Sequence, residues 1–296
     1  MITGTDGIVG KEIVHQLSKN KSYKLFLLSN SKINKKSKKK KIKLLHQDLT
    51  KPVTFKLSID AIIHCASKNP LSKVVSDMET IYKKNLKMTK NLIKFSNKND
   101  VKKIIFFSSM DVYGFIEKKI VTENLKPRNS SLYGKSKFFS EKLLNEKKNK
   151  FKTISLRIPG VFTLDLSRSQ PLVINMLKKI MNNETVYAYN LNSDFNNITD
   201  THEIVKLIDI ILKKKKIKTS IYNFSASKPI KVIDVINLIK KIFKSKSKII
   251  QKKINKTSFI ISNKKITDDF NIKISTTKNI ILRNCRKILN TDYKAA

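Results

Sequence analysis

The sequence predicts an α/β protein with a doubly wound parallel sheet and a smaller C-terminal lobe. Short apolar runs alternate with amphipathic stretches through the first half of the chain, which is the pattern of strands and crossover helices in a parallel sheet. The first of these runs leads directly into Gly4, Gly7 and Gly10 and then into a helical pattern. After Pro159 and Gly160 the alternation loosens, which indicates a second and less regular part of the chain.

The expected elements follow one another in a simple order. Runs of apolar and β-branched residues predict strands at 1–3, 24–28, 43–45, 61–64, 103–107 and 153–157. Apolar residues at helical spacing predict helices at about 8–19, 79–97 and 131–147 between them, and later helices at 170–182, 200–214 and 231–243. We therefore expect a first domain over residues 1–165 and a second over residues 166–296, partly interleaved with the first.

Composition excludes several classes of protein. With 296 residues, of which 40% are hydrophobic, the chain can bury a substantial core. Apolar runs such as Ile104–Phe107 are far shorter than a membrane span, and the first residues lack the pattern of a signal peptide. We therefore expect a cytoplasmic protein with no membrane partner. Cys65 and Cys285 are too few for a disulfide framework or a zinc cluster, so no metal site is predicted.

The net charge of +41 raises the question of a nucleic-acid partner. Lysines cluster at 35–43, which we expect to be an exposed basic loop, and at 213–218. They are otherwise spread along the whole chain without interleaved aromatic residues, and Arg, the usual reader of bases, is scarce. We predict no nucleic-acid partner. A cationic exterior would still raise the encounter rate with anionic small molecules.

The glycine segment has the chemistry of a dinucleotide site. A strand followed by glycines and a helix presents backbone N–H groups to a pyrophosphate, and glycine is needed where a side chain would block the approach. Three of the 6 glycines in the chain fall at this spacing. That concentration favours a cofactor site over an ordinary turn.

Tyr133 and Lys137 lie four positions apart in a predicted helix, so they share one of its faces. A free phenol ionises near about pH 10, and a fixed cation beside it brings its pKa toward neutral, where it can serve as acid and base. In a chain so rich in lysine the pair alone is a weak signal. Its meaning depends on the segments around it.

Together these segments resemble the extended short-chain dehydrogenase/reductases, and within them the NAD(P)-dependent epimerase/dehydratase family, which has a Rossmann fold. The similarity covers nearly the whole length and rests on the order of its motifs. Besides the glycine turn and the Tyr133–Lys137 segment, the matching segments are Gln47–Thr50, His64–Ser67, Asn85–Ile93, Ser108–Gly114, Leu156–Gly160, Phe195–Asp200, Tyr222–Ser227 and Ile261–Phe270.

The resemblance implies roles for individual residues. Tyr133 would be the catalytic acid/base, Lys137 would hold the cofactor ribose and favour the phenolate, and Ser109 would hydrogen-bond the reacting oxygen. With Lys137, the residues expected to line NAD or NADP are Gly4, Gly7, Ile8, Val9, Gly10, Ser29, Asn30, Asp48, Leu49, Cys65, Ala66, Ser67, Asn85 and Ile158. The residues expected at the substrate are Ser67, Asp111 and Arg168.

Some positions depart from the family pattern. NAD-preferring members carry an acidic residue after the second strand, whereas this chain has Ser29 to Lys32 there, so NAD and NADP both stay open. Dehydratases need an acid/base pair beside Ser109, and here only Asp111 is a carboxylate, which disfavours dehydration. Arg168 is the nearest candidate for a diphosphate clamp, with a surface role as the alternative.

The leading functional hypothesis is an NAD(P)-dependent epimerase or related oxidoreductase that acts on a nucleotide-activated sugar by hydride transfer. The residues themselves support hydride and proton transfer, and the substrate class comes from the resemblance. A 4-keto nucleotide-sugar reductase, a dehydratase and a non-catalytic nucleotide-binding protein are the alternatives. The family resemblance also implies a homodimer.

Overall fold

The computed structural model describes residues 1–31, 41–68, 77–166, 171–252 and 258–290. The chain forms two compact units that interleave along the sequence. Unit 1 consists of Met1–Phe115, Lys126–Arg157 and Ile204–Tyr222. Unit 2 consists of Ile116–Leu125, Ile158–Glu203 and Asn223–Ala296. The domain division at residue 165 stays a proposal.

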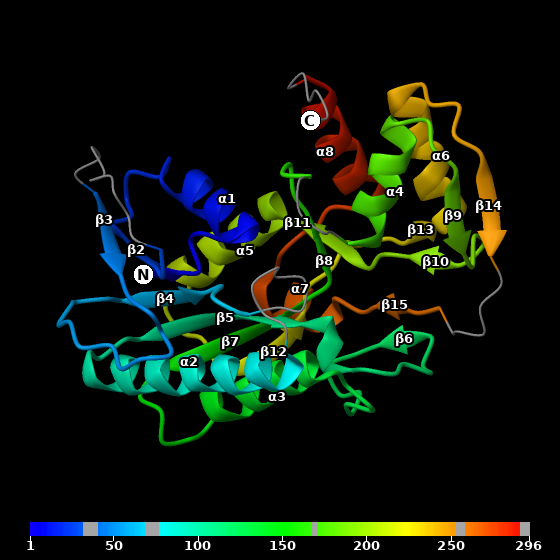
Figure 1. Cartoon of the computed structure of the whole chain (residues 1–296). Coiled ribbons are helices and arrows are strands. Elements are labelled where there is room, and N and C mark those ends of the chain that lie inside the picture. Colours follow the sequence, from blue (N-terminus) through cyan, green and yellow to red (C-terminus); the bar gives the residue numbers. More distant parts are fainter. Residues whose placement is uncertain (32–40, 69–76, 167–170, 253–257, 291–296) are drawn as a thin grey trace. The chain divides into compact units, whose positions relative to one another are not determined.

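A seven-stranded sheet in the order β12-β7-β5-β4-β1-β2-β3 organises unit 1 (Figure 1). In chain order its strands are β1 (Ile2–Thr3), β2 (Leu25–Ser29), β3 (Ile42–His46), β4 (Ala61–His64), β5 (Lys103–Ser109), β7 (Lys152–Ile158) and β12 (Ser220–Asn223). The pairs β1·β2, β1·β4, β2·β3 and β4·β5 are parallel. Strand order therefore reverses between β1 and β4, the point where doubly wound sheets bind their ligands.

The six predicted strands all lie in this sheet, which confirms the predicted fold class. The seventh strand, β12, is an addition that the sequence pattern does not predict. Its four residues follow a lysine-rich segment and are too few to give a clear periodicity.

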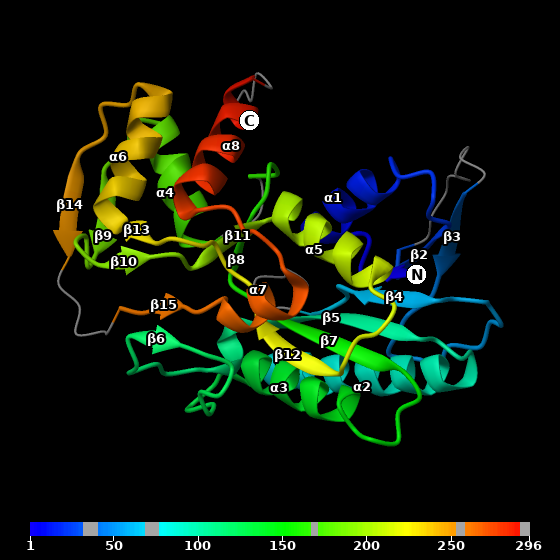
Figure 2. The ribbon, with the colours of Figure 1, turned by 180° about the vertical axis from the view of Figure 1, so that it is seen from behind.

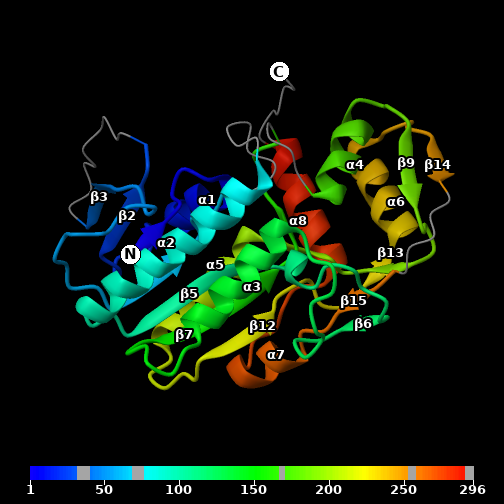
Figure 3. The same cartoon turned by 60° about the horizontal axis from the view of Figure 1, so that its bottom comes forward.

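Helices cover both faces of the sheet in unit 1 (Figure 1, Figure 3). One face carries α2 (Met78–Lys98) and α3 (Leu132–Leu144), which pack side by side, and the other carries α1 (Ile8–Leu17) and α5 (Thr201–Lys213). Asp77 begins α2 because its carboxylate accepts hydrogen bonds from the backbone N–H groups of Glu79 and Thr80, both at 3.0 Å. The ends of the predicted helices agree with these bounds within a few residues.

The apolar core of unit 1 lies where α2 covers the sheet. Leu92 of α2, Ile62 of β4 and Ile104 of β5 are each 0% exposed and belong to one cluster. Because strands of a parallel sheet are buried on both faces, they read in the sequence as continuous apolar runs.

Unit 2 combines short strands with three helices, of which α6 packs against both α4 and α8 (Figure 2). Its elements are β6 (Ile120–Val121), β8 (Gly160–Phe162), α4 (Leu172–Met181), β9 (Val186–Tyr189), β10 (Asp194–Phe195), β11 (Ile198–Asp200), β13 (Ile230–Lys231), α6 (Val232–Phe243), β14 (Ile249–Lys252), β15 (Ile260–Ile261), α7 (Lys264–Phe270) and α8 (Thr277–Asn290). The strands form two-stranded pairs, and the apolar faces of α4, α6 and α8 share one core.

Two further predictions from the sequence concern a basic loop and the absence of a membrane span. The predicted basic loop at 35–43 falls largely on residues 32–40, which lie outside the described residues. Within the described ranges, no helix is both long enough and apolar enough to span a bilayer.

The core of unit 2 can be tested with two neighbouring residues of α8. Ile288 is 1% exposed, whereas Leu289 is 52% exposed. Ile288→Ala leaves a cavity and should lower the free energy of unfolding by about 2–5 kcal/mol. Leu289→Ala should change it by about 0.5 kcal/mol or less, because its side chain is already in water. Urea denaturation of both variants checks this, and equal losses would contradict the packing described here.

Candidate active site

The glycine turn after β1 is held against the end of β4. Gly4 has a φ of +72°, a left-handed conformation that favours glycine, and a Cβ placed on it would lie 2.6 Å from the backbone nitrogen of Ala66. The N–H of Gly7 donates to the carbonyl of Gly4 at 3.1 Å, and a Cβ on Gly10 would overlap that same carbonyl. Glycine is therefore a steric requirement at Gly4 and Gly10 of this turn.

The turn leads directly into the N-terminus of α1. Gly7 is the N-cap residue of this helix, so no side chain of the N-cap residue bonds the first backbone N–H groups. The first N–H groups of a helix have no partner within the helix and carry a partial positive charge. Ile8, Val9 and Gly10 supply such groups here, and this arrangement suits an anion such as a pyrophosphate.

Three further predicted cofactor residues lie where β2 and β3 end. Ser29 is buried at the end of β2 and donates a hydrogen bond to Asp6, and the exposed Asn30 follows it. After β3, Asp48 accepts two hydrogen bonds from Thr50, at 2.8 and 2.9 Å. Burial acts to raise the pKa of Asp48, but these bonds and the lysines nearby outweigh it, so the pKa lies below its ordinary value.

Leu49 and the end of β4 are also fixed by side chains of α2. Asn91 donates to the carbonyl of Leu49 at 2.8 Å. Asn85, 4% exposed, accepts from the backbone N–H of Lys68 at 2.8 Å and donates to Ser136 at 3.0 Å. Asn85 thus joins the segment that follows β4 to helix α3. The predicted cofactor residues Cys65, Ala66 and Ser67 all lie in that segment.

His64 ends β4 beneath these residues. Its Nδ1 lies 2.8 Å from the hydroxyl of Thr3, and its ring stacks on Phe106 with centroids 5.6 Å apart. Burial, with a smaller contribution from Lys137, lowers the pKa of His64 to about 3. His64 is therefore neutral in the folded protein at physiological pH.

Tyr133 and Lys137 come together on α3 as predicted. The Nζ of Lys137 donates to the carbonyl of Phe107 at 2.8 Å and lies 5.7 Å from the ring centroid of Tyr133. Lys137 is 3% exposed, and burial lowers its pKa to about 8. An amine beside a phenol is the predicted pair, now anchored to strand β5.

The sequence predicts that Lys137 lowers the pKa of Tyr133. For the protein chain without a cofactor this prediction is wrong. Burial, then the charge of Asp111, raises the pKa of Tyr133 to about 12, while a hydrogen bond with Ser67 acts to lower it. Desolvation of the phenolate is therefore the largest effect on this pKa.

Ser109 and Asp111 lie where β5 ends. The hydroxyl of Ser109 accepts from the backbone N–H of Asp111 at 3.1 Å and begins a short 3₁₀ helix, Met110–Val112. Desolvation raises the pKa of the Asp111 carboxyl. A Cβ on Gly134 would overlap the carbonyl of Asp111, so α3 approaches this turn closely enough to require glycine.

A buried ion pair between Glu141 of α3 and Arg157 of β7 lies close to the site. Neither residue was among the predicted site residues. Glu141 accepts from Arg157 at 2.7 and 3.0 Å and from the hydroxyl of Ser108 at 2.5 Å. Burial acts to lower the pKa of Arg157, but its bonds with Glu141 raise it further above its ordinary value. The guanidinium also stacks on Tyr113, 4.6 Å from the ring centroid. The available signal was the position of Glu141, four residues after Lys137.

The remaining predicted residues are less informative. Ile158 ends β7 and is the first residue of its segment of unit 2. Arg168 lies outside the described residues. The described part of the chain contains no group of three or more His, Cys, Asp or Glu side chains that could hold a metal ion.

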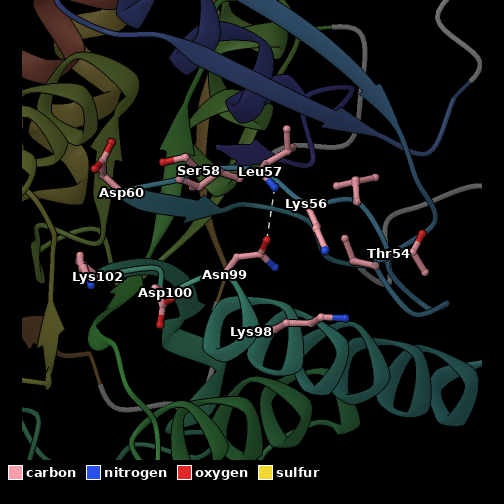
Figure 4. A pocket seen from close by; sticks show the side chains of 12 residues that line it. Thr54, Lys56, Leu57, Ser58, Asp60, Lys98, Asn99, Asp100 and Lys102 are labelled. Atoms are coloured by element: carbon pink, nitrogen blue, oxygen red, sulfur yellow. Dashed lines mark hydrogen bonds between the residues drawn. The ribbon is translucent and has the colours of Figure 1, made fainter.

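A cavity of about 570 Å³ lies elsewhere in unit 1, away from these residues (Figure 4). It is lined by residues 53–60, which lead into β4, and by Lys98, Asn99, Asp100 and Lys102, which connect α2 to β5. Asn99 spans it by accepting from the N–H of Leu57 at 3.3 Å. None of the predicted site residues lines this cavity.

A family model described as the NAD dependent epimerase/dehydratase family matches residues 1–224. The chain belongs to this family. The matched range contains the glycine turn, the Tyr133–Lys137 pair and the Glu141–Arg157 pair.

Individual relatives agree with this family. The chain is 32% identical over 151 residues to N-acetyl-alpha-D-glucosaminyl-diphospho-ditrans,octacis-undecaprenol 4-epimerase of Escherichia coli O157:H7, covering 51% of this chain and 45% of that protein. It is 24% identical over 268 residues to a UDP-glucose 4-epimerase of Lactobacillus helveticus, covering 82% and 81%. The chain spans about half the length of the first curated relatives that it matches.

Solved structures share the fold. A UDP-glucuronic acid 4-epimerase of Bacillus cereus in complex with NAD superposes with a TM-score of 0.80 at 18% identity, covering 100% of this chain and 97% of that one. A UDP-N-acetylglucosamine 4-epimerase of Methanobrevibacter ruminantium M1 gives a TM-score of 0.80 at 19% identity, covering 98% and 97%. At these identities the likeness concerns the fold alone.

The buried ion pair yields a stability prediction. Glu141→Ala leaves the Arg157 charge buried without its partner, and unfolding free energy should fall by about 3–5 kcal/mol. Glu146→Ala removes an exposed ion pair with Lys148 and should change it by about 1 kcal/mol or less. Urea denaturation of the two variants provides the comparison, and a similar small loss for both would contradict a structural role for Glu141.

The low pKa of His64 yields a pH prediction. The unfolded chain binds a proton on this residue below about pH 6.5, whereas the folded protein binds it only near about pH 3. Stability should therefore fall as the pH is lowered through this window, and His64 should contribute a slope approaching about 1.4 kcal/mol per pH unit. His64→Asn should reduce the slope measured by denaturation between about pH 6 and pH 4. An unchanged slope would show that His64 is accessible to protons in the folded state.

Proposed function

We propose that this chain is an NAD-dependent epimerase-type oxidoreductase that acts on a sugar linked to a diphosphate. Membership of the family supports the cofactor and the reaction type. The names of the relatives support the substrate class, since those proteins are epimerases of sugars carried on UDP or on an undecaprenyl diphosphate. Both carriers share a diphosphate attached to the sugar.

One observation carries this proposal. Tyr133 lies one helical turn before Lys137, and the Lys137 amine is fixed to β5 at 2.8 Å from the carbonyl of Phe107. Proton transfer to a substrate oxygen needs such a phenol at a defined position beside the strand ends.

The residues around the glycine turn fit a dinucleotide. Side chains at Gly4 and Gly10 would fill the space close to the backbone, and the N-terminus of α1 offers N–H groups to a pyrophosphate. We assign Asp48 and Leu49 to the adenine, and Cys65, Ala66, Ser67, Asn85 and Ile158 to the walls of the site. When bound, NAD would supply a reversible hydride acceptor for the substrate carbon, so the overall reaction would be redox-neutral.

Within this scheme the residues of the chain move and hold protons. Tyr133 takes the proton of the substrate hydroxyl as the hydride leaves the same carbon, and returns it when the resulting ketone is reduced. Ser109 donates a hydrogen bond to the reacting oxygen and fixes its position. Lys137 would hold the cofactor ribose, and its charge together with that of the oxidised nicotinamide would offset the burial that raises the pKa of Tyr133 to about 12.

Other functions are less well supported. A dehydratase needs a second acid/base group beside Asp111, and its neighbour Met110 is a buried apolar residue. A 4-keto sugar reductase would use the same residues but consume reduced cofactor. A non-catalytic nucleotide-binding protein would have no use for the Ser109, Tyr133 and Lys137 set. We also propose a homodimer, from the family resemblance, and a cytoplasmic location, from the pattern and composition of the sequence.

The reaction type can be decided with a substrate panel. The purified protein should interconvert C4 epimers of a UDP-sugar or of a polyprenyl-diphosphate-linked sugar without a net change in reduced cofactor. Product analysis by chromatography, with the absorbance of reduced cofactor followed in parallel, separates the cases. Stoichiometric loss of reduced cofactor would favour the reductase, and inactivity on both carriers would overturn the proposal.

The assigned role of Tyr133 can be tested by removing one oxygen atom. Tyr133→Phe keeps the ring but cannot transfer a proton, so turnover should fall by about 10²–10⁴-fold while NAD binding remains nearly unchanged. Tyr187→Phe is the control, because Tyr187 is 46% exposed on β9 of unit 2. Steady-state rates and calorimetric titration with NAD measure the two properties. Full turnover by Tyr133→Phe would remove Tyr133 from this role.

A further inference from the structure

The carboxylate nearest the end of β2 comes from the glycine turn and not from β2 itself. Between Ser29 and Asp48 the sequence contains no Asp or Glu. Strand β1 pairs in parallel with β2, with Thr3 opposite Leu28, so the turn after Thr3 lies beside the end of β2. There Ser29 Oγ donates a hydrogen bond to Asp6 Oδ2.

This contact holds Asp6 in a defined position. Ser29 is 1% exposed, and its Oγ also accepts from the backbone N–H of Ser31 at 2.9 Å. The hydroxyl of Thr5 makes a second tie between the turn and β2, to the carbonyl of Leu28 at 3.4 Å. Asp6 itself is exposed, so one carboxylate oxygen is fixed by Ser29 while the side chain faces solvent.

We propose that Asp6 determines the choice between NAD and NADP. This inference rests on the proposed dinucleotide site. In doubly wound folds that bind NAD, a carboxylate about 20 residues after the glycines accepts hydrogen bonds from the adenosine ribose at the end of the second strand. Here that position holds Ser29 and Asn30, and Asp6 supplies the carboxylate from the other side of the same strand end.

The chemistry of the two cofactors differs at one group. The ribose of NAD offers hydroxyls that can donate to Asp6, whereas NADP carries a 2′-phosphate with about −1.5 to −2 charges in the same place. A hydrogen bond to a charged group changes affinity by roughly 10- to 100-fold, and repulsion between the carboxylate and the phosphate adds to this difference.

The charge of the whole chain makes this local group decisive. A net charge of +41 favours the more anionic cofactor at long range. Salt screens that attraction beyond about 8–10 Å, whereas a carboxylate in contact with the ribose acts within a few ångströms. A preference for NAD in such a basic protein would therefore come from a nearby acid, and Asp6 lies at the end of β2 in hydrogen-bond contact with Ser29.

The test measures binding and not turnover. Calorimetric titration of cofactor-free protein with NAD and with NADP should give at least about 10-fold tighter binding of NAD. Asp6→Ser should weaken the binding of NAD and strengthen the binding of NADP. The ratio of the two affinities should therefore fall by about 10-fold or more. Asp234→Asn, which makes the same charge change on an exposed residue of α6, should leave the ratio unchanged.

The outcomes separate this inference from the proposed function. Because Asp6 is exposed, Asp6→Ser should fold, and thermal melting checks this. An unchanged ratio in Asp6→Ser, or tighter binding of NADP by the wild-type protein, would overturn the role of Asp6 while leaving a dinucleotide site. Binding of neither cofactor by the wild-type protein would instead overturn the proposed function.

Discussion

The hydrogen bond from Lys137 to the carbonyl of Phe107 is the interaction on which the candidate site depends. A buried amine loses its hydration and keeps its position only where protein groups replace the water. Lys137 has the Phe107 carbonyl at 2.8 Å and the faces of Phe106 and Tyr133 at 5.0 and 5.7 Å. Since Phe107 belongs to β5, this bond fixes α3 on the sheet and places Tyr133 near the strand ends.

Polar contacts between α2 and α3 reinforce that placement. Asn85 bonds Ser136, and four residues later Thr89 lies 2.9 Å from the hydroxyl of Ser140. The equal spacing on both helices sets their relative register, because a slip would leave buried polar groups without partners. Stability is not the main gain from such buried polar contacts, since apolar residues of similar shape would serve as well. Their benefit is a single defined position for the site.

The sequence predicted those features that depend on neighbours along the chain. The six strands, the glycine turn and the Tyr133–Lys137 pair all follow from periodicity or short spacing. Contacts between distant segments were not predictable in this way, such as Asp6 with Ser29 or Glu141 with Arg157. The pKa of Tyr133 was expected to fall beside Lys137 and instead rises to about 12, because the balance between burial and charge is set only when the chain folds.

We propose that the half-buried phenol of Tyr133 becomes an acid/base when a second positive charge joins Lys137. Ultraviolet difference titration of the wild-type protein against Tyr133→Phe isolates the ionisation of this one residue. In the free protein the pKa of Tyr133 should be about 12, and binding of NAD should lower it toward neutral. A pKa of Tyr133 that stays high in the NAD complex would contradict it.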